Sequence, residues 1–179
     1  MKILHIKQQD YKVGQWSGGS TTELFIWPEN ADYAKREFSL RVSSARVDLE
    51  ESDFTPLQGV LRYITPLTGG FRLQHPGKAP VVMAPMAEPY CFSGEIPTHC
   101  VGKATDLNLM LKGIDGQMAL CQDCWQIRPG FNCLYATETT QISLAADYTL
   151  QPGELLVVFS QEAADAAISE KSICCWANV

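Results

Sequence analysis

The chain has 179 residues, and its 14 lysines and arginines against 20 aspartates and glutamates give a net charge of −6 at neutral pH. This length supports one substantial hydrophobic core or two small ones, and a hydrophobic content of 46% is ordinary for a globular protein. The negative charge argues against nucleic acid or an anionic membrane as a partner, and the lack of both a long apolar run and a signal-peptide pattern predicts a cytoplasmic protein.

Short strands account for most of the first 113 residues. Residues 21–27, TTELFIW, are rich in β-branched and aromatic side chains and end at Pro28, which is typical of a strand. Residues 38–43 alternate apolar and polar side chains, the period of a half-buried strand. The sequence further predicts a glycine- and serine-rich loop at 11–20, a solvated turn at 48–53, a tight hairpin turn at 68–70, and strands at 3–7, 60–65, 71–73, 81–83 and 105–111.

Five more short strands follow at intervals of about 8–14 residues, the spacing of a β-sandwich or barrel. We place them at 118–120, 124–127, 132–136, 140–144 and 154–159. The alanine-rich segment 162–169 predicts about two turns of helix, and 173–176 predicts a returning edge strand. The order indicates an all-β chain with very little helix, divided into a first barrel at 1–113 and a second, smaller β part at 114–179.

Arg62 lies in a segment that otherwise has the pattern of a buried strand. It shares its strand face with the apolar residues Val60 and Ile64. A buried guanidinium without a partner costs several kcal/mol, so we expect a carboxylate or a bound anion beside it. Three interpretations stay open: an internal ion pair with Glu23 or Asp106, a solvated outer face, or an anion-binding pocket inside the first barrel.

Arg41 and Asn108 support the pocket hypothesis. The guanidinium of Arg41 can hold a carboxylate in two parallel hydrogen bonds, and Ser43 on the same strand face adds a hydroxyl. Asn108 shares a face with Asp106 and Met110, and its amide offers both a donor and an acceptor to a ligand. The alternative for this polar set is hydrogen bonding within the sheet.

The seven cysteines allow three interpretations. In a reducing compartment they remain thiols and behave mostly as small buried hydrophobes, the interpretation we favour. Cys121 and Cys124 form a C-x-x-C pair with Cys133 nine residues further on, which gives a structural zinc site as a second interpretation. Redox chemistry of the C-x-x-C pair is the third, although its surroundings resemble a strand and turn and not the start of a helix.

Motifs for metal-dependent or nucleophilic catalysis are missing. The three histidines, His5, His75 and His99, are isolated, whereas a cupin metal centre needs a clustered set with an H-x-H pair. The sequence contains no G-x-S-x-G elbow, P-loop or dinucleotide fingerprint. We therefore expect no metal and no cofactor.

Six short segments of the first 112 residues carry a resemblance to a known family. They are Trp16–Glu23, Phe38–Ala45, Phe54–Arg62, Leu67–Gly70, Phe92–Glu95 and Asp106–Met110. In this order they resemble the HutD/Ves family of small bicupin-like proteins. The resemblance implies two packed cupin-like (jelly-roll) β-barrels in a cytoplasmic accessory or regulatory protein of histidine utilisation, a binding protein and not a well-defined enzyme.

The resemblance and the residues together define a predicted site in the first barrel. Its ligand is a small organic carboxylate of the urocanate or formylglutamate class. The expected ligand-binding residues are Arg41, Arg62, Asn108 and Ser43, with Trp16, Phe92 and Met110 as walls and with Glu23 and Asp106 orienting the arginines. The alternatives are a metal-independent isomerase or hydrolase with Glu23 or Asp106 as general base, and an interaction scaffold without a ligand. Because cupin-type barrels commonly pair through exposed strands, the resemblance also allows a homodimer.

Overall fold

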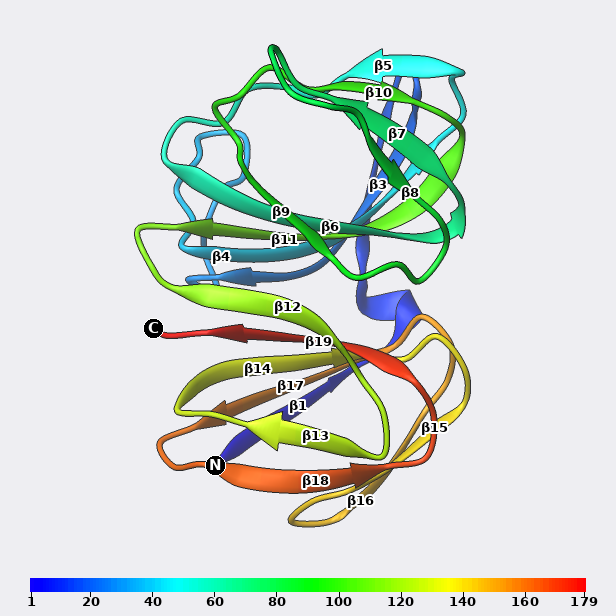
Figure 1. The fold of residues 1–179 in the computed structure, drawn as a ribbon. Helices are drawn as coiled ribbons and strands as arrows, with labels where there is room; N and C mark the ends of the chain where they lie inside the picture. Colours follow the sequence, from blue (N-terminus) through cyan, green and yellow to red (C-terminus); the bar gives the residue numbers. More distant parts are fainter. The chain divides into compact units, whose positions relative to one another are not determined.

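The computed structural model describes residues 1–179 and consists of strands except for one short 3₁₀ helix (Figure 1). The all-β prediction is confirmed. The chain divides into two compact units: the N-terminal barrel, Lys12–Gly113, and the C-terminal barrel, which combines Met1–Tyr11 with Ile114–Val179. No helix in the structure has the length and apolar character that crossing a membrane requires.

The N-terminal barrel consists of two antiparallel sheets. Its larger sheet has the strand order β2 (Lys12–Trp16), β3 (Gly19–Trp27), β4 (Leu40–Val47), β11 (Ala104–Lys112), β6 (Val60–Gly69) and β9 (Tyr90–Ser93). Its smaller sheet has the order β5 (Glu51–Asp53), β10 (His99–Val101), β7 (Phe71–Gln74) and β8 (Val81–Met83). Two apolar clusters hold the sheets together, one around Ile64, Leu73 and Phe92 and one around Leu57 and Met110.

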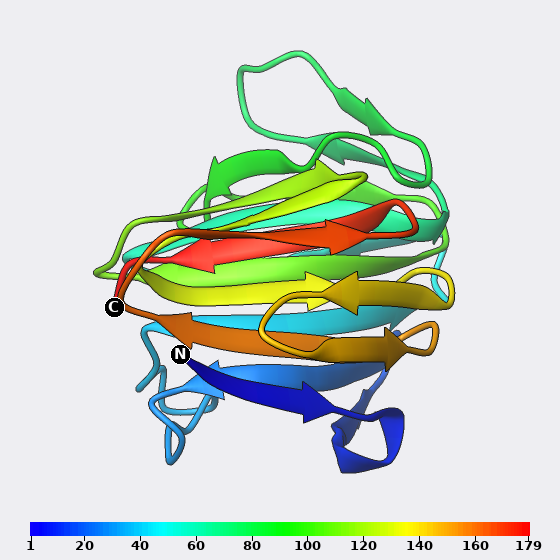
Figure 2. The same cartoon turned by 90° about the horizontal axis from the view of Figure 1, so that it is seen from below.

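The C-terminal barrel repeats the two-sheet arrangement. One sheet has the order β1 (Lys2–Ile6), β17 (Leu155–Ser160), β14 (Gly130–Tyr135), β19 (Ser172–Ala177) and β12 (Gly116–Cys121), and Figure 2 shows β1 in blue beside β17 in orange. The other sheet has the order β13 (Cys124–Ile127), β18 (Ala164–Ile168), β15 (Thr140–Ser143) and β16 (Asp147–Leu150). A single apolar cluster fills the space between these sheets, with Trp125, Leu134 and Leu156 each at most 1% exposed.

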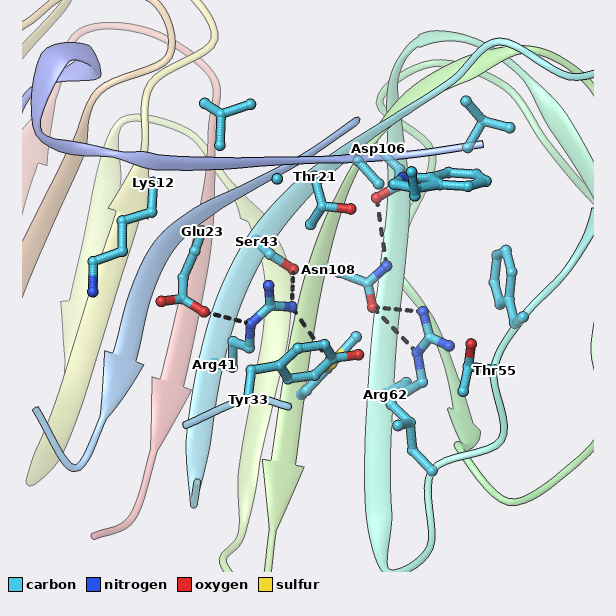
Figure 3. Close-up of a pocket in the computed structure, with 18 of the residues that line it drawn as sticks. Lys12, Thr21, Glu23, Tyr33, Arg41, Ser43, Thr55, Arg62, Asp106 and Asn108 are labelled. Atoms are coloured by element: carbon cyan, nitrogen blue, oxygen red, sulfur yellow. Dashed lines mark hydrogen bonds and ion pairs between the residues drawn. The ribbon is translucent and has the colours of Figure 1, made fainter. Parts of the chain in front are cut away.

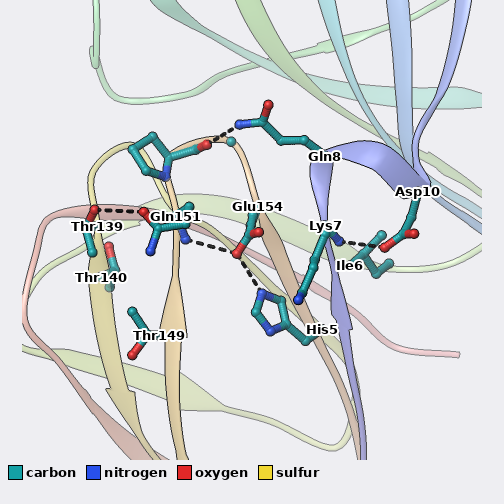
Figure 4. Close-up of polar contacts among 12 residues, drawn as sticks. His5, Ile6, Lys7, Gln8, Asp10, Thr139, Thr140, Thr149, Gln151 and Glu154 are labelled. Atoms are coloured by element: carbon teal, nitrogen blue, oxygen red, sulfur yellow. Dashed lines mark hydrogen bonds and ion pairs between the residues drawn. The ribbon is translucent and has the colours of Figure 1, made fainter.

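The first eleven residues are fixed to the C-terminal barrel, whereas the sequence analysis assigned them to the first barrel. Strand β1 pairs antiparallel with β17, and the 3₁₀ helix η1 (Gln8–Asp10) follows it. His5 Nε2 lies 2.7 Å from Glu154 Oε2 (Figure 4), and the hydroxyl of Tyr11 donates to the carbonyl of Gly153 at 3.0 Å. Sequence proximity alone misses this pairing, because its partners are about 150 residues apart.

Several local predictions are wrong. The segment 162–169 contains no helix: Ala164–Ile168 is strand β18, which pairs with β13 and β15 and buries Ala166 and Ile168. Its alanines favour a helix, and pairing on both sides overrides that propensity. Residues 12–16 of the expected loop form β2, residues 51–53 of the expected turn form β5, and the last strand lies between β14 and β12 and not at an edge.

Candidate functional site

A cavity of about 770 Å³ borders one face of the six-stranded sheet in the N-terminal barrel (Figure 3). Small-molecule sites typically enclose about 300–1,000 Å³, so its size suits a small ligand. Strands β2, β3, β4, β6 and β11 supply its floor, and the segments around Tyr33 and Phe54 supply walls. All of its lining residues lie within Lys12–Gly113.

The register of three neighbouring strands brings the polar side chains together. Met110 on β11 stands opposite Arg41 on β4 and also opposite Arg62 on β6. Two residues along, Asn108 stands opposite Ser43. Side chains two residues apart in a strand point to the same face, so these residues share one side of the sheet. The two arginines are therefore two strands apart, roughly 10 Å between their backbones.

Arg41 has its charge compensated within the protein. Its side chain is buried, and its Nε donates to Glu23 Oε2 at 3.0 Å while its Nη1 donates to Ser43 Oγ at 2.9 Å. The guanidinium also lies 3.9 Å from the centre of the Tyr33 ring, a cation–π distance. A carboxylate, a hydroxyl and an aromatic face together satisfy this cation. An internal ion pair with Glu23 was one expectation for Arg62, and in the structure it is Arg41 that forms it.

Arg62 has no such carboxylate. It is only 6% exposed, and its Nε and Nη2 both donate to Asn108 Oδ1, at 3.3 and 3.2 Å. The rings of Phe54 and Phe92 lie 4.7 and 5.3 Å from the guanidinium carbon. Burial lowers the pKa of Arg62, and the charge of Asp106 opposes that shift. A neutral amide and two rings therefore surround a buried cation.

Asp106 is linked to Arg62 through Asn108. The amide nitrogen of Asn108 donates to Asp106 Oδ1 at 3.4 Å, and its oxygen faces Arg62 (Figure 3). Burial raises the pKa of Asp106 to about 6, although the hydrogen bond from Asn108, the charge of Arg62 and the backbone of Ala45 each act in the opposite direction. The Asp106 carboxyl group therefore titrates close to neutral pH, inside the barrel.

The donor groups of this cavity do not fit a metal ion. No histidine or cysteine lines it, and no group of three or more His, Cys, Asp or Glu side chains in the chain is arranged to hold a metal. His75 and His99 line a separate, smaller cavity of about 280 Å³ in the same barrel. The alternative zinc ligands Cys121, Cys124 and Cys133 are likewise not assembled as a metal site.

The structure places most of the predicted site residues around the cavity. They are Arg41, Arg62, Asn108, Ser43, Trp16, Met110, Glu23 and Asp106. Phe92 is different: it packs behind Arg62 in the apolar cluster, stacked on Tyr90, and does not line the cavity. Its register position opposite Arg62 explains the contact.

Two aromatic residues beside the cavity were not predicted from the sequence. Tyr33 and Phe54 each face one of the arginines, and each lies in an irregular segment between strands. Lys12, Thr21 and Thr55 also line the cavity. In the sequence, Tyr33 and Phe54 are each a single aromatic residue within a polar stretch. Such a pattern does not indicate which strand the aromatic side chain will pack against.

Comparison with known proteins identifies the family. The HutD family profile matches residues 8–176, almost the whole chain. The chain belongs to the HutD family. No curated protein sequence matches this HutD-family chain.

Solved structures support the same fold. HutD from Pseudomonas fluorescens SBW25 superposes with a TM-score of 0.84 at 20% identity, over 99% of this chain and 98% of that one. A conserved protein of unknown function from Pseudomonas aeruginosa PAO1 gives a TM-score of 0.84 at 21% identity, over 100% of both chains. The bacterial pirin YhhW from Escherichia coli, described in complex with nickel(II), gives 0.67 at 11% identity over 99% of both chains. The cupin-like fold is confirmed.

Proposed function

We propose that this HutD-family protein binds a small organic anion in the cavity of the N-terminal barrel, as an accessory or regulatory protein of histidine utilisation. The observation that carries the proposal is Arg62, which is 6% exposed and meets a neutral amide instead of a carboxylate. A cation held this way favours an incoming anion, because the free energy cost of removing it from water has already been met in the folded protein.

The pattern of charge compensation supports a ligand with one carboxylate. Arg41 is already paired with Glu23, so Arg62 is the cavity arginine without a hydrogen-bonded carboxylate. The charge of Asp106, which acts on Arg62, repels a second anionic group. Of the two predicted ligand classes, the monocarboxylate urocanate class therefore suits the cavity better than the dicarboxylate formylglutamate class.

The walls favour a flat ligand. The ring of Phe54 lines the cavity beside Arg62, and Trp16 also lines it with 41% of its surface exposed. The Tyr33 ring is already covered by the guanidinium groups of Arg36 and Arg41. Aromatic faces contribute most when they stack on another planar group. The Asn108 oxygen accepts two hydrogen bonds from Arg62 and so holds the guanidinium plane in one orientation. A ligand carboxylate that pairs with Arg62 is oriented by that plane.

A thermal-shift screen of small carboxylates tests the proposal. A ligand present at about 100 times its dissociation constant adds about 2.7 kcal/mol to the free energy of unfolding. We expect urocanate to raise the unfolding temperature, formylglutamate to raise it less, and neutral amides to leave it unchanged. Arg62→Ala should abolish the shift. Arg46→Ala is the matched control, since Arg46 is an exposed arginine that pairs with Asp48 at 2.9 Å.

Two results would contradict anion binding at this site. One is a carboxylate-induced shift of the same size in Arg62→Ala and in the unaltered protein. The other is the absence of a shift with every carboxylate, which is what an interaction scaffold without a ligand would give. The cytoplasmic location and a homodimeric state stay predictions from the sequence.

The titration of Asp106 near pH 6 favours a metal-independent enzyme as the second candidate function. A carboxyl group with a pKa close to neutrality can act as a general base. Asp106 lines the cavity and accepts a hydrogen bond from the Asn108 amide, so in this alternative it takes a proton directly from a bound ligand. Incubation of the protein with urocanate followed by NMR distinguishes the two: a binding protein returns the ligand unchanged.

A further inference from the structure

We propose that Cys121 and Cys174 in the C-terminal barrel form a reversible disulfide when a hydroperoxide oxidises the reduced protein. The two residues belong to strands β12 and β19, so the proposed partner of Cys121 is Cys174 and not Cys124, the other cysteine of the C-x-x-C pair. The inference is independent of the proposed anion binding, because it concerns residues of the other barrel.

Strand register places the two thiols next to each other. Strands β12 and β19 are antiparallel, with Cys121 opposite Ser172 and Ala119 opposite Cys174. The two cysteines are therefore diagonal neighbours on one face of the sheet. Cys121 Sγ lies 3.6 Å from the Ser172 carbonyl oxygen, Cys174 Sγ lies 3.4 Å from the Ala119 carbonyl oxygen, and the two sulfurs are within hydrogen-bonding reach of each other.

The surroundings make one sulfur of the pair the better nucleophile. The hydrogen bond from Cys121 lowers the pKa of Cys174, and the charge of Arg128 acts in the same direction. The same hydrogen bond and burial raise the pKa of Cys121. Arg128 is held near the site by Trp176, whose ring centre lies 5.3 Å from the guanidinium carbon. A partly exposed thiol with a lowered pKa beside a second thiol is the usual arrangement of a peroxide-sensitive pair.

The other cysteines differ from this pair in solvent exposure or in contact with a second thiol. Cys133 and Cys175 are directly opposite each other on β14 and β19, yet both are buried and burial raises their pKa values. Cys100 is buried in the N-terminal barrel, where burial raises its pKa to about 12. Cys121 and Cys174 are both partly exposed at the margin of the apolar cluster. Contact with a second thiol and access to solvent coincide at this pair.

The chemistry requires only a hydroperoxide. The thiolate of Cys174 attacks the peroxide oxygen, forming an S–O bond while the O–O bond breaks and the departing oxygen leaves as water or alcohol after taking up a proton. Cys121 then attacks the sulfenic sulfur, forming the S–S bond while hydroxide leaves with the Cys121 proton as a second water. Two thiols lose two electrons and two protons, and the peroxide is reduced by the same two electrons.

The position of β12 explains why the bond is reversible. Diagonal residues have Cα atoms about 7–8 Å apart, whereas a disulfide spans about 4.4–6.8 Å, so the strands must approach each other. β12 pairs only with β19 and is the edge strand of its sheet, so the hydrogen bonds of a single strand pair oppose its shift. A disulfide formed under such strain is reduced readily, as expected of a regulatory bond.

Peptide mapping of the oxidised protein tests the proposal. Fully reduced protein is treated with hydrogen peroxide, alkylated, and digested with trypsin without reductant. Cleavage after Lys171 separates the two partners, so the expected disulfide joins the peptide Ser172–Val179 to the one that contains Cys121. Intact-mass analysis should show the loss of two hydrogens, and glutathione should restore the reduced mass. Persistence of the bond in excess glutathione would contradict the proposed reversibility.

Single substitutions assign the bond. Cys121→Ser and Cys174→Ser should each abolish the linked peptides, whereas Cys124→Ser and Cys175→Ser should leave them unchanged. Linked peptides that survive in Cys121→Ser, or that disappear in Cys124→Ser, would overturn the assignment. So would peroxide treatment that yields only sulfinic acid at Cys174. Circular dichroism confirms that each variant is folded, and Cys121→Ala replaces the serine variant if a hydroxyl at this position disrupts the barrel.

Discussion

The two barrels of this chain share an architecture and differ in what fills them. The C-terminal barrel is occupied by one apolar cluster, in which Leu134, Leu156 and Val158 are completely buried. In the N-terminal barrel, inward positions on three neighbouring strands hold Arg41, Asn108 and Arg62 around a cavity. The same two-sheet fold thus gives a solid core or a polar cavity according to a few inward side chains.

The polar floor also divides the hydrophobic core of the N-terminal barrel. One apolar cluster lies around Phe92 and Leu73, and a separate cluster lies around Leu57 and Phe38. Each borders one of the arginines through an aromatic side chain, Phe92 for Arg62 and Tyr33 for Arg41. The barrel therefore keeps its cavity open at the cost of a continuous core.

The largest expected change in stability comes from creating a cavity in the apolar core of the C-terminal barrel. Trp125 is 1% exposed in the apolar cluster, so Trp125→Ala should lower the free energy of unfolding by about 3–5 kcal/mol. Urea denaturation measures the loss. The variant creates an apolar cavity without a cation, so carboxylate binding should be unchanged wherever the protein remains folded. New carboxylate binding in this variant would show that an empty barrel alone suffices for it.

Asp106→Asn should remove a pH dependence of about 3 kcal/mol from the N-terminal barrel. The folded pKa of about 6 lies above the ordinary value of 3.8, so the folded protein binds an extra proton between these values. Stability from this group is therefore present below pH 4, falls as the pH rises towards 6, and stays lower above it by about 3 kcal/mol. Urea denaturation of both proteins from pH 4 to 7 measures the difference. Identical pH slopes would show that Asp106 is not desolvated as described.

The two arginines should respond differently to the same substitution. Arg41→Met leaves the Glu23 carboxylate, 20% exposed, without its partner and should destabilise the protein by about 2–3 kcal/mol. Arg62→Met leaves the neutral amide of Asn108 and removes the charge that lowers the pKa of Asp106, so Asp106 takes up a proton more readily. Relief of the buried charge then offsets the lost hydrogen bonds, and the change should stay within about 1 kcal/mol at pH 6. Arg62→Met should nevertheless abolish carboxylate binding. Equal destabilisation by both variants would contradict the division into a structural and a ligand-binding arginine.

The smallest effect is expected at the rim of the cavity. Trp16 is 41% exposed, in contrast to Trp125, so Trp16→Ala should change stability by no more than about 0.5 kcal/mol. The same urea denaturation provides the comparison between the two tryptophans. A loss above about 1 kcal/mol would mean that Trp16 packs against the barrel more firmly than its exposure indicates.

The sequence predicted the fold class and the floor of the site because both depend on local periodicity. Arg62 shares a strand face with Val60 and Ile64, which predicts a buried cation, and all three residues are buried in the structure. Which group compensates which arginine depends on the register between strands, so the pairing of Glu23 with Arg41 could not be derived. The roles of Tyr33 and Phe54 depend on the path of irregular segments, for which periodicity has no signal.

The position of β1 has a consequence for synthesis on the ribosome. It emerges before the whole N-terminal barrel, yet its partner β17 is translated about 150 residues later. The N-terminal barrel is contiguous in sequence and has all its strands once Gly113 has emerged. Until β17 arrives, β1 is an unpaired strand edge attached to a barrel that is already complete, open to pairing with another chain. Nascent chains that stall beyond Gly113 would therefore aggregate through β1 and not through the N-terminal barrel.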